Sequence, residues 1–236
     1  MLAIFKRELK SYFTTPTGYI FMAVFLALSG LIFNVYTFMS GTSETAGYFM
    51  TLLFVFIIVI PILTMRLLSE ERRSKTEQIL LTSPVSIWSM ILAKFFAAYT
   101  MFVITFAISE IIHFSFLSMY ADTINYAKVF GSFIGVCLIG AAFIAIGLFL
   151  SSLTESQVVA AITTMAVIIV LVLASTLATS VGNDALRVVI KWLAIFSRFS
   201  PFSYGIFDIP SVVYYISLSV IFLFLTVRVY EKRRWE

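Results

Sequence analysis

Glu110 and His113 are the residues whose types and spacing are best suited to proton chemistry. They lie three residues apart inside an apolar stretch, so a helix places them on one face. A charged group at membrane depth costs on the order of 3 kcal/mol, so both side chains should face protein or water. Two interpretations follow. The pair makes a structural contact, either within itself or with Asn125 or Arg198, or it lines a path for a substrate or for protons.

The residue inventory argues against an intramembrane enzyme built on this pair. The chain has a single histidine, and its one cysteine, Cys137, lies in an apolar run. No nucleophile, base and orienting group are evident together, and a metal site normally needs several histidine, cysteine or carboxylate ligands. We therefore expect no catalytic residue and no metal, and no cofactor on this chain.

A second candidate region is the charged segment from Arg66 to Lys94, which lies between two apolar stretches. Ser69–Leu81 is predicted to be a helix, with Ser69 as N-cap and Lys75 pairing with Glu71 at i+4. Pro84 then forces a turn. A charge-rich segment is usually a solvated loop, but apolar leucines with charged flanks are typical of a surface that a soluble partner grips.

These residues belong to a chain with the composition of an integral membrane protein. Of its 236 residues, 61% are hydrophobic and 12% are charged, whereas soluble domains are about a quarter charged. We expect an all-α fold, with a single transmembrane domain over residues 1–236. Six stretches are long enough to span a bilayer: Gly18–Phe38, Tyr48–Met65, Phe95–Leu117, Val129–Leu150, Val158–Ala178 and Val212–Tyr230.

The distribution of lysine and arginine predicts the orientation of the spans. With the N-terminus inside, twelve of the sixteen basic residues fall on cytoplasmic segments. Both termini are therefore predicted to be cytoplasmic, and residues 66–94 with them. The remaining four, Lys128, Arg187, Lys191 and Arg198, fall on the outer side.

Two segments are predicted to lie at the membrane surface. Residues 1–17 have apolar residues at helical spacing with Lys6, Arg7 and Lys10 on the other side, which is typical of an interfacial helix that turns into the first span. This elbow is a plain anchor, a contact for a cytoplasmic partner, or both. Residues 179–211 are too apolar for an aqueous loop and predict short re-entrant outer helices. Their Arg187, Lys191 and Arg198 form a rim for lipid headgroups or contact an anionic substrate or lipid.

Three segments in order resemble membrane subunits of the second class of ABC exporters, especially the small permeases of gliding-motility and copper-processing systems. Glu70–Val85 (EERRSKTEQILLTSPV) is similar to the coupling-helix region of that family. Gly140–Gln157 resembles its fourth span and following turn, and Phe222–Trp235 its closing segment.

The resemblance implies a permease subunit of an ATP-driven exporter in the cytoplasmic membrane of a prokaryote. Two such subunits pair, as a homodimer or with a relative, and each receives a cytoplasmic ABC ATPase. An accessory membrane protein is a further partner, and nucleic acid is not one. ATP and Mg would be bound by the ATPase, since this chain lacks a G-x-x-x-x-G-K-[ST] motif. The residues assigned to the ATPase contact are Glu70, Glu71, Arg72, Arg73, Thr76, Glu77, Leu80, Leu81, Thr82 and Pro84.

An alternative function is a membrane scaffold that recruits a cytoplasmic protein without moving a substrate. Docking and coupling would use the same surface, so the sequence does not separate the two. The substrate is not predicted either, because the spans are built from generic apolar residues.

Overall fold

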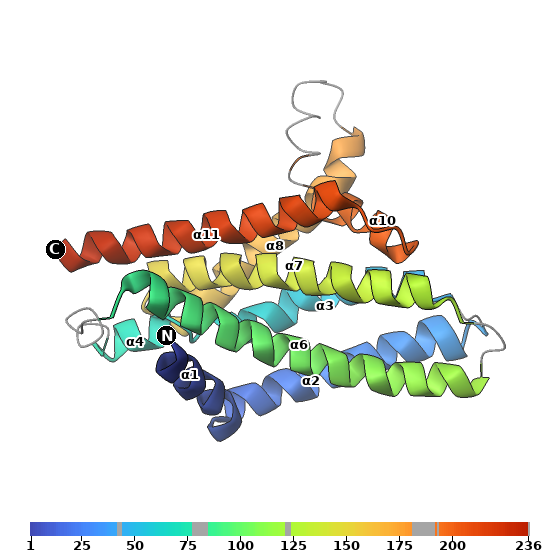
Figure 1. Cartoon of the computed structure of the whole chain (residues 1–236), viewed down its shortest axis with the longest axis horizontal. Coiled ribbons are helices and arrows are strands. Elements are labelled where there is room, and N and C mark those ends of the chain that lie inside the picture. The colour runs from blue at the N-terminus through green and yellow to red at the C-terminus, as the bar shows by residue number, and fades with distance from the viewer. Residues whose placement is uncertain (42–43, 77–84, 121–123, 181–191, 193, 236) are drawn as a thin grey trace.

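Six long helices run side by side in the computed structural model of this chain (Figure 1), which describes residues 1–41, 44–76, 85–120, 124–180, 192 and 194–235. Within those residues, six helices are long and apolar enough to cross a membrane. Both termini lie at one end of the bundle, with the short helix α4 (Figure 1). We call this the charged end, and the end with the α2–α3 and α6–α7 connections the opposite end. The predicted all-α, six-span fold is confirmed.

The helix bounds extend the predicted spans by a few residues, mainly for the third and sixth. The elements are α1 (Leu2–Thr14), α2 (Pro16–Phe33), the π-helix η1 (Asn34–Phe38), α3 (Ala46–Thr64), α4 (Ser69–Arg73), α6 (Ile87–Tyr120), α7 (Tyr126–Leu153), α8 (Gln157–Ser180), the 3-10 turn η2 (Phe196–Arg198), α10 (Ser200–Ser203) and α11 (Ile209–Trp235).

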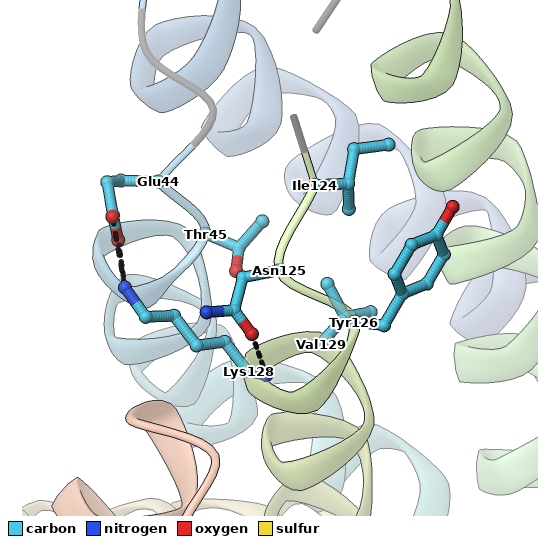
Figure 2. A pocket seen from close by; sticks show the side chains of 7 residues that line it. All are labelled: Glu44, Thr45, Ile124, Asn125, Tyr126, Lys128 and Val129. Atoms are coloured by element: carbon cyan, nitrogen blue, oxygen red, sulfur yellow. Dashed lines mark hydrogen bonds and ion pairs between the residues drawn. The ribbon is translucent and has the colours of Figure 1, made fainter. Parts of the chain in front are cut away.

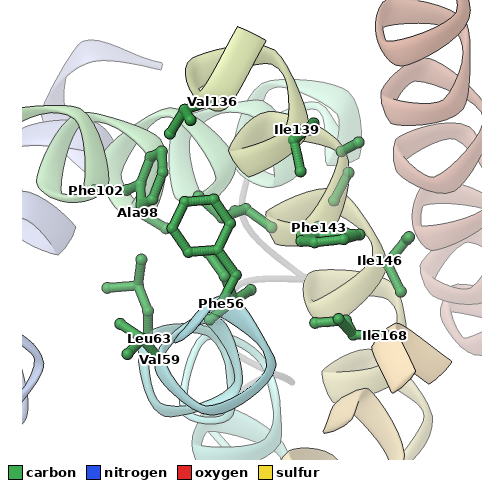
Figure 3. Close-up of a cluster of buried hydrophobic side chains, with 14 of the residues drawn as sticks. Phe56, Val59, Leu63, Ala98, Phe102, Val136, Ile139, Phe143, Ile146 and Ile168 are labelled. Atoms are coloured by element: carbon green, nitrogen blue, oxygen red, sulfur yellow. The ribbon is translucent and has the colours of Figure 1, made fainter. Parts of the chain in front are cut away.

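Helix α7 is the centre of the bundle and packs against α3, α6, α8, α10 and α11. Figure 3 shows its inward face, where Ile139 and Phe143 meet Phe56 of α3 and Phe102 of α6. Phe56 and Phe102 pack edge to face with ring centroids 5.3 Å apart. These rings fix how α3, α6 and α7 sit against one another, and so fix the polar groups at both ends of the same helices.

Glycines of α7 are used for close packing inside this subunit. A Cβ atom on Gly147 would lie 2.3 Å from Thr64 Oγ1, and one on Gly140 would lie 2.3 Å from the Phe102 ring. At Gly131 it would lie 2.7 Å from the carbonyl oxygen of Phe202. Small residues let helices approach this closely. The glycine spacing of the fourth span therefore serves packing within the subunit at these positions.

Helix α1 is separate from α2, as the sequence predicts. Thr15 has an extended backbone, and Pro16 starts α2 at a position where its missing N–H is not needed. The hydroxyl of Tyr12 donates to the carbonyl of Leu63 at 3.1 Å, which joins α1 to the end of α3. The placement of α1 in the membrane surface stays a prediction.

The connection between the last two spans contains short helices where it is described. Turn η2 and helix α10 follow one another, and α10 packs on α7. Gly205 ends α10 with a φ of +78° and lies against the backbone of Ala127 and Lys128. Their position relative to the bilayer stays a prediction.

Candidate functional site

Lys94 is the centre of a polar network at the charged end. This residue of α6 is only 1% exposed, although burial of an unpaired ammonium is very costly. Its Nζ donates to Glu71 Oε1 at 2.8 Å, to Glu8 Oε1 at 3.2 Å and to the carbonyl of Leu67 at 3.0 Å. An ammonium has three donors, and all three are used here.

The two carboxylates come from helices far apart in sequence. Glu8 lies on α1 and Glu71 on α4, and Arg7 pairs with both, at 2.7 Å and 3.3 Å. Burial acts to raise the pKa of Glu8, but Lys94 and Arg7 together outweigh it, so this pKa lies below the usual glutamate value. Glu8 is therefore held as a carboxylate that ties α1 to α6.

The start of α4 is held by α7. Ser151 Oγ accepts from the backbone N–H groups of Leu68 and Ser69, at 3.3 Å and 3.1 Å, and donates to the carbonyl of Met65 at 3.2 Å. Ser151 lies one turn beyond Gly147, where α7 touches Thr64. This contact caps a helix start from a different helix, which no local sequence pattern reveals.

Three arginines join neighbouring elements to the same end. Arg66 binds Glu70 through two hydrogen bonds, at 2.7 Å and 2.9 Å, and also donates to Thr17 Oγ1. Arg72 pairs with Glu155 in the α7–α8 turn at 3.1 Å and donates to the carbonyl of Leu153 at 2.9 Å. Arg233 of α11 donates to the carbonyl of Ser152 at 2.5 Å. The charged end thus connects α1, α4, α6, α7 and α11.

The predicted helix over Ser69–Leu81 needs correction in its described part. Helix α4 ends at Arg73, and its N-cap is Leu68 rather than Ser69, whose hydroxyl donates back to the Met65 carbonyl. Lys75 has a φ of 57°, so it does not continue the helix, and Glu71 pairs with Lys94 and Arg7 in place of Lys75. Tertiary ion pairs have overridden the local i+4 pattern.

The structure describes only some of the residues assigned to the ATPase contact. Glu70, Glu71, Arg72, Arg73 and Thr76 are described and lie on or just after α4. The others lie outside the described residues: Glu77, Leu80, Leu81, Thr82 and Pro84.

A cavity of about 520 Å³ opens beside this network. Its lining includes Arg7, Arg66, Glu71, Ser74 and Thr76. Glu71 Oε2 is buried and accepts no hydrogen bond from the residues that the structure describes. Glu71 therefore borders the cavity next to the predicted docking segment, with this oxygen itself shielded from solvent.

The intramembrane pair Glu110 and His113 meets at a third residue that the sequence did not indicate. Tyr48 of α3 donates to Glu110 Oε1 at 2.7 Å and lies 3.0 Å from His113 Nδ1. His113 stacks on Phe33, with ring centroids 4.4 Å apart. Within the described residues no direct Glu110–His113 bond is formed. Tyr48 is 62 residues from Glu110, so only the packing of α3 on α6 brings them together.

The other partners considered for Glu110 are engaged elsewhere. Figure 2 shows Asn125 at the start of α7, where Oδ1 accepts from the backbone N–H of Lys128 at 3.2 Å. Lys128 Nζ pairs with Glu44 at 2.9 Å across a pocket of about 450 Å³ at the opposite end. Arg198 lies over the rings of Tyr214 and Trp192, at 4.4 Å and 5.4 Å.

The predicted outer rim is described only in part. Arg187 and Lys191 lie outside the described residues, and Arg198 is within them. The Nε atom of Arg198 is buried and has no hydrogen-bond acceptor in the described part of the chain. A headgroup or anion contact at this rim stays a prediction.

Comparison with known families decides the class of protein. Residues 32–230 match the family described as ABC-2 family transporter protein. The chain belongs to this family. The match covers the network from Arg66 to Ser152 and the triad of Tyr48, Glu110 and His113, and it starts after α1. No curated protein matches the chain significantly.

Membership gives the general role. ABC-2 proteins of this kind are membrane permease subunits of ABC transporters, and the family implies association with an ABC ATPase. The chain is accordingly a multi-pass membrane protein, and its family is typically non-catalytic. The family predicted from the resemblance of Glu70–Val85, Gly140–Gln157 and Phe222–Trp235 is therefore confirmed.

Proposed function

We propose that the chain is the membrane subunit of an ATP-driven exporter, and that the charged end is where a cytoplasmic ATPase docks and transmits its motion. The single observation that carries this proposal is the buried ion network around Lys94. Through it, α4 is tied to α1 and α6, while Ser151 ties α4 to α7. A movement imposed on α4 would reach α1, α6 and α7 through these contacts.

Charge and burial also favour the charged end as the surface where the ATPase docks. Glu71 Oε2 is a buried acceptor without a described donor, and the adjoining cavity also presents Ser74 and Thr76. The twelve basic residues on this side of the spans support a cytoplasmic location.

The functional cycle follows from the same connections. ATP binding would close two ATPases on each other, and the two charged ends of a permease pair would move with them. Since a ligand shifts only an equilibrium between states that it contacts differently, the two states must differ in the ATPase contacts of α4 and the segment beyond it. The second permease is a copy of this chain or a relative, in the plasma membrane of a prokaryote.

A tagged chain purified from native membranes in mild detergent tests the partnership. We expect an ATPase of about 25–35 kDa to co-purify. This is the mass of a single nucleotide-binding domain at the upper end of the usual range of domain sizes. Recovery of a different cytoplasmic protein and no ATPase would favour the scaffold instead.

ATP hydrolysis by the purified complex separates coupling from recruitment. Leu80→Asp and Leu81→Asp should each change the ATPase rate, whereas Leu80→Met and Leu81→Met, which keep the apolar volume, should leave it near wild type. A scaffold would lose its partner with the aspartate variants, but the ATPase rate per bound partner would stay the same. Unchanged docking and unchanged ATPase rate in both aspartate variants would contradict the assignment.

A further inference from the structure

Helix α1 has two sides that differ in what they contact. Its inner side is joined to the bundle through the Glu8 carboxylate and the Tyr12 hydroxyl. Its outer side is formed by residues at spacings of three, four and seven, which a helix places in one stripe. These residues are Leu2, Lys6, Lys10 and Phe13, and all four are exposed. We call this stripe the outer face of α1.

The three basic residues of α1 are used in different ways. Arg7 pairs with Glu8 and Glu71, at 2.7 Å and 3.3 Å, and so belongs to the buried network. Lys6 and Lys10 form no ion pair with any residue that the structure describes. They lie one helical turn apart, where side chains are neighbours. The outer face therefore carries two adjacent positive charges that the described part of the chain does not compensate.

The joint between α1 and α2 sets the depth of the outer face in the membrane. Helix α1 ends at Thr14, and the first candidate span begins at Pro16 (Figure 1). Tyr19, in the first turn of that span, donates from its hydroxyl to the carbonyl of Phe13 at 3.0 Å. Its ring is exposed, and tyrosine is enriched where a span meets the headgroups. A helix tied to the start of a span in this way is held at the level of the headgroups.

We propose that the outer face of α1 binds the headgroup of an anionic phospholipid, and that this lipid sets how strongly the ATPase is coupled. The phosphate would lie between Lys6 and Lys10, and the acyl chains would run past Phe13 and Tyr19. Charge favours an anionic lipid, because a zwitterionic headgroup brings a further positive charge towards the two lysines. A soluble partner would not reach Phe13 and Tyr19 at the start of the span. Basic amphipathic helices bind anionic lipids through such a pairing of charge and apolar area.

The link from this lipid to the ATPase runs through α1 itself. On the inner side of the same helix, Arg7 pairs with Glu71 of α4, and Glu8 shares the Lys94 ammonium with it. A lipid that holds the outer face in place would therefore also fix α4. This regulatory step rests on the proposed function, in which the ATPase docks at α4 and the segment beyond it.

Fluorescence quenching of the permease alone tests lipid binding. Phe13→Trp places a reporter in the outer face, and nanodiscs of phosphatidylcholine receive a small fraction of brominated phosphatidylglycerol, whose bromine atoms quench tryptophan. The same measurement without the reporter corrects for the three native tryptophans. We expect the anionic lipid to quench the reporter well beyond its share of the bilayer. Brominated phosphatidylcholine at the same fraction should quench only in proportion to its share.

Two double variants in the reporter background show whether charge selects the lipid. Lys6→Gln with Lys10→Gln should lower the preference for phosphatidylglycerol by about 25-fold, since each lysine near an anionic surface contributes about fivefold. Lys6→Arg with Lys10→Arg keeps both charges and should retain the preference. Equal quenching by the two brominated lipids, or an unchanged preference in the glutamine variant, would overturn the lipid site.

The ATPase rate of the complex tests the regulatory step. Adding phosphatidylglycerol to neutral nanodiscs should raise the rate of the wild type and of the arginine variant, and should leave the glutamine variant unchanged. A wild-type rate that does not respond would overturn the regulation. Loss of ATPase co-purification in the glutamine variant, without selective quenching, would show that the ATPase contacts this face instead of lipid. Because the quenching test contains no ATPase, its failure would leave the docking proposal unaffected, and absence of an ATPase partner would leave the lipid site unaffected.

Discussion

The two ends of the bundle bury glutamates in opposite ways. At the charged end, Glu8 and Glu71 share the ammonium of Lys94 and are joined by Arg7. At the opposite end, Glu110 has a tyrosine and no described cation. The same residue type is thus an ion-paired connector between three helices in one place and, in the other, a carboxyl group hydrogen-bonded to a tyrosine. The difference supports the charged end as the place where motion is transmitted between helices.

The comparison also explains why both sites depend on α6 and α3. Lys94 and Glu110 lie on α6, and Leu63 and Tyr48 lie on α3. The aromatic core between the sites includes Phe56 and Phe102 (Figure 3). A rigid core of this kind transmits small shifts because it is close-packed.

The largest effect is expected from Lys94→Met. It removes the buried cation that Glu8 and Glu71 share and leaves them only the more exposed Arg7, and loss of one partner of a buried ion pair costs about 3–5 kcal/mol. Thermal unfolding in detergent should show a strongly lowered midpoint. The double variant Lys94→Met with Glu71→Gln should recover part of the loss, and Lys6→Met, at an exposed lysine of α1, should be close to wild type. A mild effect of Lys94→Met would break the contrast between the two ends.

A matched pair of glycine substitutions should give the next largest difference. Gly147→Ala places a Cβ atom 2.3 Å from Thr64 Oγ1, and overpacking of this kind costs about 1–3 kcal/mol. It should also displace Ser151 from the start of α4 and lower ATPase co-purification. Gly30→Ala, at the opposite end, meets only His113 Nε2 at 4.0 Å and should be neutral or slightly stabilising. Equal effects would show that α7 does not hold α4 in this way.

Two buried tyrosines allow a direct comparison of the ends. Tyr48→Phe removes a donor to a carboxylate, and Tyr12→Phe removes a donor to the Leu63 carbonyl. Since the Tyr48 hydroxyl bonds both Glu110 and His113 and the Tyr12 hydroxyl makes one bond, we expect losses of about 2 and about 1 kcal/mol in unfolding free energy. If Tyr12→Phe were the more damaging, the two bonds of Tyr48 would not stabilise the packing of α3 on α6 as the structure indicates.

The smallest effect on stability is expected from Glu155→Gln. Its partner Arg72 is 29% exposed and Glu155 is 63% exposed, and ion pairs at such positions contribute about 0–1 kcal/mol. The midpoint of thermal unfolding should barely move, and the change should vanish at high salt. A large salt-independent loss would place Glu155 within the buried network.

Hydropathy and charge predicted the six spans and the short helices before the last one, because long apolar runs and basic flanks are properties of single segments. They did not predict that Lys94, one of the twelve basic residues of that side, is buried, or that Tyr48 joins Glu110 to His113. Both depend on which faces of different helices meet. Helices that are apolar all round carry little periodicity to indicate their faces, and the i+4 pattern of Glu71 and Lys75 was misleading because Lys94 offered a stronger partner.

The central claim is that the charged end, and not the opposite end, contacts the ATPase. A photo-crosslinking amino acid placed at Thr76, on the charged end, or at Ser118, near the opposite end of α6, tests it directly in intact cells. The account predicts a crosslink to an ABC ATPase from Thr76 and none from Ser118. A crosslink from Ser118, or the absence of one from Thr76 when the ATPase co-purifies with the same variant, would contradict it.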